Sequence, residues 1–152
     1  MTGWFLFYLY IGLMAYFLFF SERYGRVIDS GEYRYNLEFL KEIKRFITYR
    51  KVVGFESFVI NIVGNLVAFA PFGFMLPLLS KKYRKFFYIT FLSLELSFFV
   101  ELAQLLFKVG IFDVDDIFLN TIGGILGFLF YRICSFIFSK GTSKKRKSRK
   151  GD

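Results

Sequence analysis

Four long apolar stretches dominate this 152-residue chain and limit the folds open to it. Each has the length of roughly 17–25 residues that a helix needs to cross a bilayer. With 55% hydrophobic residues and 24 phenylalanines, the chain has more apolar surface than a soluble core of this length can bury. We therefore predict an all-α membrane protein, a bundle of four transmembrane helices over Trp4–Phe20, Val59–Leu79, Phe86–Phe107 and Ile117–Phe138.

The first stretch is predicted to stay in the protein as a span. No basic residue precedes it, and no small-residue cleavage site follows it in Ser21–Tyr24, so it lacks the pattern of a secretory signal. We expect a transmembrane domain over residues 1–138 and a basic tail over residues 139–152.

The orientation of the spans follows from Lys and Arg near their ends, because cytoplasmic loops carry an excess of these residues. Basic runs occupy Lys81–Lys85, between the second and third spans, and Lys144–Lys150, after the fourth. The Lys108–Asp115 connection has one Lys and two Asp and is placed outside. Arg23 and Arg26 follow the first span and point weakly the other way. The balance predicts a multi-pass membrane protein with both termini in the cytoplasm.

The long loop from Ser21 to Phe58 contains one segment with helical periodicity, Asn36–Lys51. Apolar residues at positions 40, 43 and 47 lie on one side, and charged residues lie elsewhere. Two interpretations fit this pattern equally: an extracytoplasmic amphipathic helix on the membrane surface, or a short helix packed over the bundle.

A set of polar residues lies within the spans or at their ends, on the side predicted to face outward. On each helix the spacing is three or four residues, which puts the side chains of a pair on one face. At 1.5 Å per residue, the three helices bring them to within roughly 6–9 Å of the outer boundary. Polar groups are costly in lipid, so we predict a binding site formed by Asn61, Asn65, Glu101, Gln104, Asp113, Asp116 and Asn120.

Each member also has a structural explanation. The asparagines are residues that commonly form hydrogen bonds between helices, and Asp113 is placed to cap the fourth span. For Asp113 and Asp115, capping or a solvated loop is the favoured interpretation. Glu101 fits a purely structural role least, because a carboxylate in a span needs a proton, a partner or water.

Other charged residues do not join this set. Glu95 is about 240° around its helix from Glu101 at 100° per residue, and the sequence offers it no partner. The basic tail fits anionic membrane lipid, or a disordered segment that only fixes topology, and no nucleic acid is expected as a partner. We expect no cofactor and no metal; the oligomeric state is left open.

Four motifs in this order resemble the VanZ-like family of bacterial membrane proteins. They are Asn61-Ile62-Val63-Gly64-Asn65, then Ala68 to Gly73, then Glu101-Leu102-Ala103-Gln104, and finally Asp113 to Gly124. Many members carry an Arg shortly before the first aspartate, where this chain has Gly110-Ile111-Phe112. The resemblance implies a cell-envelope role in low-level antibiotic resistance, to the lipid-tailed glycopeptide teicoplanin and less or not to vancomycin.

Two functions remain from the sequence. The first is a non-catalytic protein whose outward pocket binds a lipid headgroup, a lipid-linked cell-wall precursor or a lipoglycopeptide. The second is a membrane-embedded enzyme in which Glu101 and Asp116 act as acid and base, or hold a cation, on a lipid-linked substrate. The chain has no His, and no Ser stands beside a recognisable base, which favours the first function.

Overall fold

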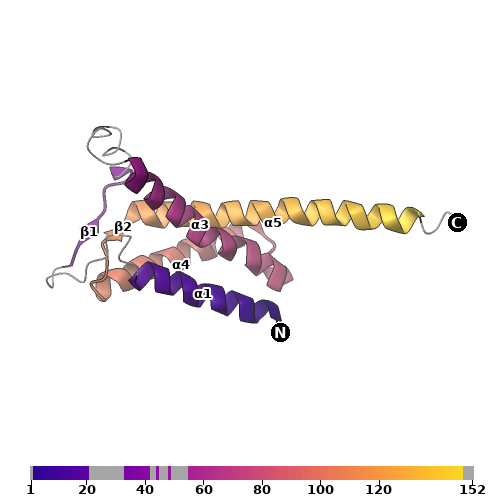
Figure 1. Ribbon diagram of the computed structural model, residues 1–152, viewed down its shortest axis with the longest axis horizontal. Coiled ribbons are helices and arrows are strands. Elements are labelled where there is room, and N and C mark those ends of the chain that lie inside the picture. Colours follow the sequence, from indigo (N-terminus) through magenta and orange to yellow (C-terminus); the bar gives the residue numbers. More distant parts are fainter. Residues whose placement is uncertain (1, 21–32, 42–43, 45–47, 49–54, 149–152) are drawn as a thin grey trace.

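Four helices form a bundle in the computed structural model, which describes residues 2–20, 33–41, 44, 48 and 55–148 (Figure 1). The helices are α1 (Thr2–Phe20), α3 (Phe55–Leu79), α4 (Phe86–Leu106) and α5 (Val114–Ser148). Among the described residues, these 4 are long and apolar enough to cross a membrane, so the predicted membrane fold is confirmed. The protein is an integral membrane protein of all-α class.

Several helix ends differ from the ends of the predicted spans. The α3 helix begins at Phe55 rather than Val59, and α5 begins at Val114 rather than Ile117. The α5 helix also continues past Phe138 to Ser148, into the segment predicted as a basic tail. Hydropathy marks where a span leaves the lipid, but lysine and arginine are good helix formers, so the helix itself need not end there.

Shorter elements join the helices. A 3-10 turn, η2 (Lys81–Tyr83), connects α3 to α4, and Ser80 caps it by accepting a hydrogen bond from the Lys82 backbone N–H. Two two-residue strands, β1 (Tyr35–Asn36) and β2 (Phe112–Asp113), pair in parallel. In Figure 1 these strands lie at the end of the bundle opposite the two chain termini, and this end is called the polar end below.

The predicted amphipathic helix over Asn36–Lys51 is corrected at its start. Asn36 lies in β1 because its backbone is extended against Asp113 of β2. Lys41, Lys44 and Thr48 are helical, whereas residues 42–43, 45–47 and 49–51 lie outside the described part of the chain.

Close contact between α3 and α5 organises the bundle. A Cβ added to Gly73 would overlap the backbone of Gly124, and one added to Gly127 would overlap the carbonyl oxygen of Ala70. A Cβ added to Gly123 would also come too close to the Leu66 backbone, at 2.5 Å from its carbonyl oxygen. Small residues let helix backbones approach in membranes, where burial of apolar surface gives little driving force between helices.

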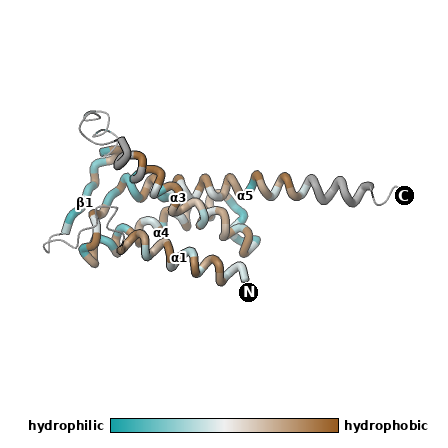
Figure 2. The backbone as a smooth tube through the Cα atoms, viewed as in Figure 1, coloured by the Kyte–Doolittle hydropathy of each residue, from teal (hydrophilic) through white to brown (hydrophobic). Residues whose placement is uncertain are grey.

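Apolar side chains fill the rest of the bundle and also cover its outside. One buried cluster joins Phe7, Phe72, Ile89 and Phe128, and a second joins Met14, Leu18, Phe69 and Val100. Large side chains such as Phe91 and Phe130 are exposed on the outer surface. Figure 2 shows hydrophobic residues along the helices and hydrophilic residues near β1 and at the turn between α3 and α4. This distribution suits a bundle surrounded by lipid.

Candidate functional site

The seven predicted site residues all lie at the polar end, where α3 and α5 begin and α4 ends. Asn65, Glu101, Gln104 and Asn120 are buried, with 7%, 2%, 2% and 1% of their surface exposed. Asn61, Asp113 and Asp116 are half-buried. The structure therefore gathers them in one part of the molecule, but their hydrogen bonds divide them into smaller groups.

One group links α3 to α5. The Nδ2 of Asn65 donates to Asn61 Oδ1 at 3.2 Å and to Asp116 Oδ1 at 2.6 Å. Helical spacing puts both asparagines on one face of α3, as predicted, and the close α3–α5 packing brings Asp116 opposite them. Both protons of the Asn65 amide are thus used, and Asp116 accepts a hydrogen bond from a neighbouring helix.

A second group surrounds the first turn of α5. The backbone N–H of Asp113 donates to Glu101 Oε2 at 3.0 Å, and the backbone N–H of Asp115 donates to Asp113 Oδ1 at 2.8 Å. The second contact confirms the predicted helix cap at Asp113. Glu101 thus points at the start of α5, where the unpaired N–H groups and the helix dipole favour negative charge. This contact gives the buried Glu101 carboxylate one of the partners that its place in a span requires.

The loop before α3 contributes to the site in a way that the sequence did not indicate. Asn36 is 7% exposed, and its Nδ2 donates to both carboxylate oxygens of Asp113 at 3.1 Å each. The backbone N–H of Leu40 donates to Asp115 Oδ1. Leu40 has φ of 60°, an unfavourable conformation for a leucine, so this contact helps to hold a strained turn over the site.

Asp115 is buried beneath the 33–41 segment. It is 4% exposed, so the interpretation of a solvated aspartate is wrong for this position. The burial results from the 33–41 segment, which β1–β2 pairing lays across the start of α5. A single sequence cannot reveal such a contact, because more than 70 residues separate Leu40 from Asp115.

Two of the predicted residues tie helices together. Gln104 Nε2 donates to the backbone oxygen of Leu18 at 2.9 Å, which satisfies a carbonyl in the last turn of α1. Asn120 Nδ2 donates to Ser97 Oγ at 2.9 Å and joins α5 to α4. Within the described residues, Asn120 Oδ1 and Ser93 Oγ are buried without a hydrogen-bond partner.

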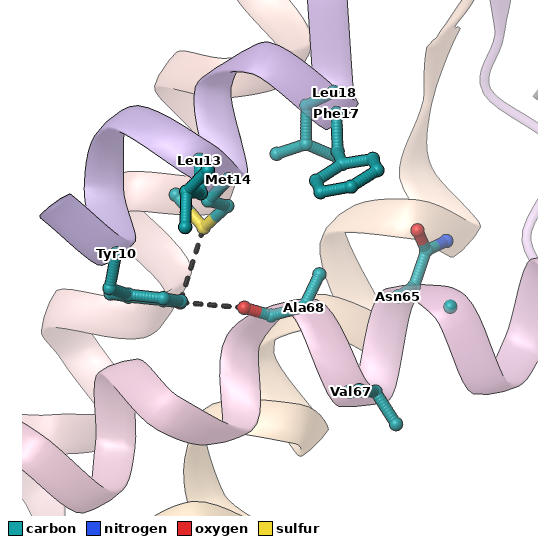
Figure 3. A pocket seen from close by; sticks show the side chains of 9 residues that line it. Tyr10, Leu13, Met14, Phe17, Leu18, Asn65, Val67 and Ala68 are labelled. Carbon is teal, nitrogen blue, oxygen red and sulfur yellow. Dashed lines mark hydrogen bonds between the residues drawn. The ribbon is translucent and has the colours of Figure 1, made fainter. Parts of the chain in front are cut away.

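A groove of about 340 Å³ opens between α1 and α3 beside this site. Its walls are Tyr10, Leu13, Met14, Phe17 and Leu18 on α1, and Gly64, Asn65, Val67 and Ala68 on α3 (Figure 3). Asn65 is the one member of the seven predicted residues that lines it. The groove therefore meets the polar site at a single amide.

The remaining candidates do not join the site. Glu95 is exposed on α4, away from the buried Glu101, as the helical angle predicted. Across the described residues, no three His, Cys, Asp or Glu side chains are grouped so that they could hold a metal ion. The described part of the site therefore offers hydrogen-bonding groups and carboxylates.

Comparison with known proteins agrees with the motifs. The family model described as VanZ/LLP1 matches residues 7–135. Protein VanZ of Enterococcus faecium is 34% identical over 74 residues, which are 47% of this chain and 44% of that protein. The aligned region thus spans less than half the length of this relative. No solved structure matches the chain.

Proposed function

The chain belongs to the VanZ/LLP1 family, and on that premise we propose that it is a non-catalytic protein of the bacterial cell envelope. Its polar end faces outward and binds a lipid headgroup, a cell-wall precursor or a lipid-tailed glycopeptide. Binding there lowers the susceptibility of the cell to teicoplanin.

The convergence of polar side chains at one end of the bundle supports this proposal most. Residues from α3, α4, α5 and the loop before α3 meet there, and four of them are carboxylates: Glu101, Asp113, Asp115 and Asp116. Four helices that only needed to pack could do so with fewer acidic groups, because each charge in a span is costly. A ligand that interacts with these carboxylates would explain why the protein keeps them despite this cost.

The charge distribution supports the outward orientation. The Lys81–Lys85 run and the basic C-terminal segment lie toward the other end of the bundle, and basic residues favour the cytoplasmic side. The polar end then faces the cell exterior, where glycopeptides and cell-wall precursors are met.

The contacts of Glu101 argue against catalysis by this residue and for a role in positioning the start of α5. A general acid or base must come within hydrogen-bond reach of the substrate. Glu101 is 2% exposed and accepts a hydrogen bond from the Asp113 backbone, so it supports the start of α5. The competing proposal is an enzyme in which Glu101 and Asp116 form a catalytic pair. It requires a covalent change in a lipid or precursor.

Susceptibility to teicoplanin and vancomycin provides the test. One susceptible strain would express, at matched membrane levels, the native protein, Glu101→Gln or Glu95→Gln. Glutamine keeps the size of the side chain, and Glu95→Gln removes the same charge from the lipid-facing side of α4. We expect the native protein and Glu95→Gln to raise teicoplanin tolerance, and Glu101→Gln to lose most of the effect.

Two results would count against the proposal. If native protein leaves teicoplanin susceptibility unchanged, the resistance role fails. If mass spectrometry finds a lipid, precursor or drug that is chemically modified only when the native protein is present, the protein is an enzyme.

A further inference from the structure

The groove between α1 and α3 has a buried floor and an exposed rim. Met14, Leu18 and Asn65 form the floor and are 6%, 8% and 7% exposed. Leu13, Phe17 and Val67 form the rim and are 52%, 54% and 62% exposed. Since α1 and α3 are both spans, the rim opens sideways toward the hydrocarbon region of the bilayer, and an occupant can enter from the membrane.

The two ends of the groove differ chemically. At the end far from the polar site, the Tyr10 hydroxyl donates a hydrogen bond to the Ala68 backbone oxygen at 2.6 Å (Figure 3). The same hydroxyl lies 3.2 Å from Met14 Sδ, and the two contacts close this end of the groove. At the other end, Asn65 rises from α3 toward α1 (Figure 3) and bonds to Asp116. Along α1, Tyr10 to Leu18 spans about 12 Å at 1.5 Å per residue. The shape is a narrow apolar slot with one polar end.

The hydrogen bonds of Asn65 define which polar group fits that end. Its two Nδ2 protons are donated to Asn61 and Asp116. Because the Asp116 carboxylate can only accept, the amide nitrogen, and not the amide oxygen, must face Asp116. The Oδ1 atom remains as an acceptor, and no donor to it is found among the described residues. A ligand group at this point must donate a hydrogen bond, and the Asp116 carboxylate beside it favours a cation and disfavours a phosphate.

We propose that this groove holds the hydrocarbon chain of a membrane lipid whose headgroup is an amine or another hydrogen-bond donor, with the headgroup against Asn65 beside Asp116. The volume of about 340 Å³ is within the range of about 300–1,000 Å³ for small-molecule sites, at its lower end, and suits a single chain. This inference rests on the proposed function, because it specifies the chemistry of the ligand bound at the same end of the bundle.

Photo-crosslinking in lipid nanodiscs tests the proposal directly. The native protein is exposed to two diazirine probes with the same hexadecyl chain, one ending in a primary amine and one in a phosphate. Mass spectrometry then maps the labelled residues. We expect the amine probe to label the groove, at Leu13, Phe17 or Val67, with about tenfold preference over the phosphate probe, the effect of one charge-assisted hydrogen bond of typical strength.

Three variants separate groove binding from contact with bulk lipid. Ala68→Phe places a ring inside the groove and should abolish labelling there. Val63→Phe adds a ring of the same size to an exposed position on α3 that does not line the groove, and should leave labelling intact. Asn65→Leu removes the acceptor and should reduce the preference for the amine probe.

The proposal is overturned by any of three results. They are equal labelling of the groove by both probes on the native protein, labelling that survives Ala68→Phe, or labelling of the groove by a lipid-tailed glycopeptide but by neither lipid probe. The comparison of two probes on native protein needs no variant to fold. Groove labelling without any effect on teicoplanin tolerance would defeat the proposed function and leave this inference intact. Teicoplanin tolerance without groove labelling would defeat this inference and leave the proposed function intact.

Discussion

Asn65 of α3 and Asp116 of α5 lie 2.6 Å apart, from Nδ2 to Oδ1, at the polar end of the bundle. The pair joins the two most closely packed helices, and it is also the point at which the α1–α3 groove reaches the polar site. One hydrogen bond thus serves the assembly of the bundle and positions the amide that faces the groove.

Exchange of donor and acceptor between these two positions should preserve the bond. Asn65→Asp puts a carboxylate against Asp116 and is expected to lower the free energy of unfolding by about 1–2 kcal/mol, the usual range for such bonds in model membrane helices. Adding Asp116→Asn restores a carboxylate–amide pair and should recover most of that loss. SDS titration in mixed micelles at neutral pH measures the free energy of unfolding of each variant. If the effects of the two single substitutions simply add in the double variant, the pair does not interact.

Removal of the Asn36 side chain should release the 33–41 segment from the site. Asn36→Ala loses two hydrogen bonds to the Asp113 carboxylate, and bonds to charged groups contribute about 1.5–3 kcal/mol. We expect faster amide hydrogen exchange in residues 33–41 and at the first turn of α5. Arg34→Ala is the control, since the exposed Arg34 contributes its backbone oxygen to the Phe112 N–H. Equal exchange rates in the two variants would remove Asn36 from this role.

A methyl group at the α3–α5 contact should destabilise the bundle. Gly127→Ala places Cβ against the Ala70 carbonyl oxygen, so the helices must separate or shift, at a cost of about 1–3 kcal/mol for overpacking. Gly12→Ala in α1 is the matched control. Nothing lies within 4 Å of the added Cβ there, and alanine favours a helix over glycine by about 1 kcal/mol. Similar melting temperatures for the two variants would contradict the close contact.

Cysteine labelling in intact cells should establish the orientation. In a Cys134→Ser background, Ile111→Cys reports on the α4–α5 loop and Lys82→Cys reports on η2, both exposed positions. A membrane-impermeant maleimide should label Ile111→Cys in intact cells and Lys82→Cys only after lysis, because the basic loop favours the cytoplasm. The opposite pattern would place the polar end in the cytoplasm and defeat the proposed function.

The spans and most of the site follow from local sequence. Apolar length is a property of each stretch, so the four spans are found from composition alone, with small errors at ends such as Phe55 and Val114. The depth and face of Asn61, Asn65, Glu101 and Asn120 follow from a fixed rise and turn per residue. The cap at Asp113 is equally local, because its partner is two residues away.

Contacts between distant segments were decided by tertiary structure. The sequence gives no indication that Asn36 bonds to Asp113 or that Leu40 bonds to Asp115, since strand pairing across more than 70 residues determines both. The groove beside Asn65 depends on how far α1 stands from α3, and that spacing results from the whole bundle. The sequence alone therefore determined which residues share a depth and a helix face, because helix geometry is local; only the packed bundle decided which of them meet and where a cavity remains.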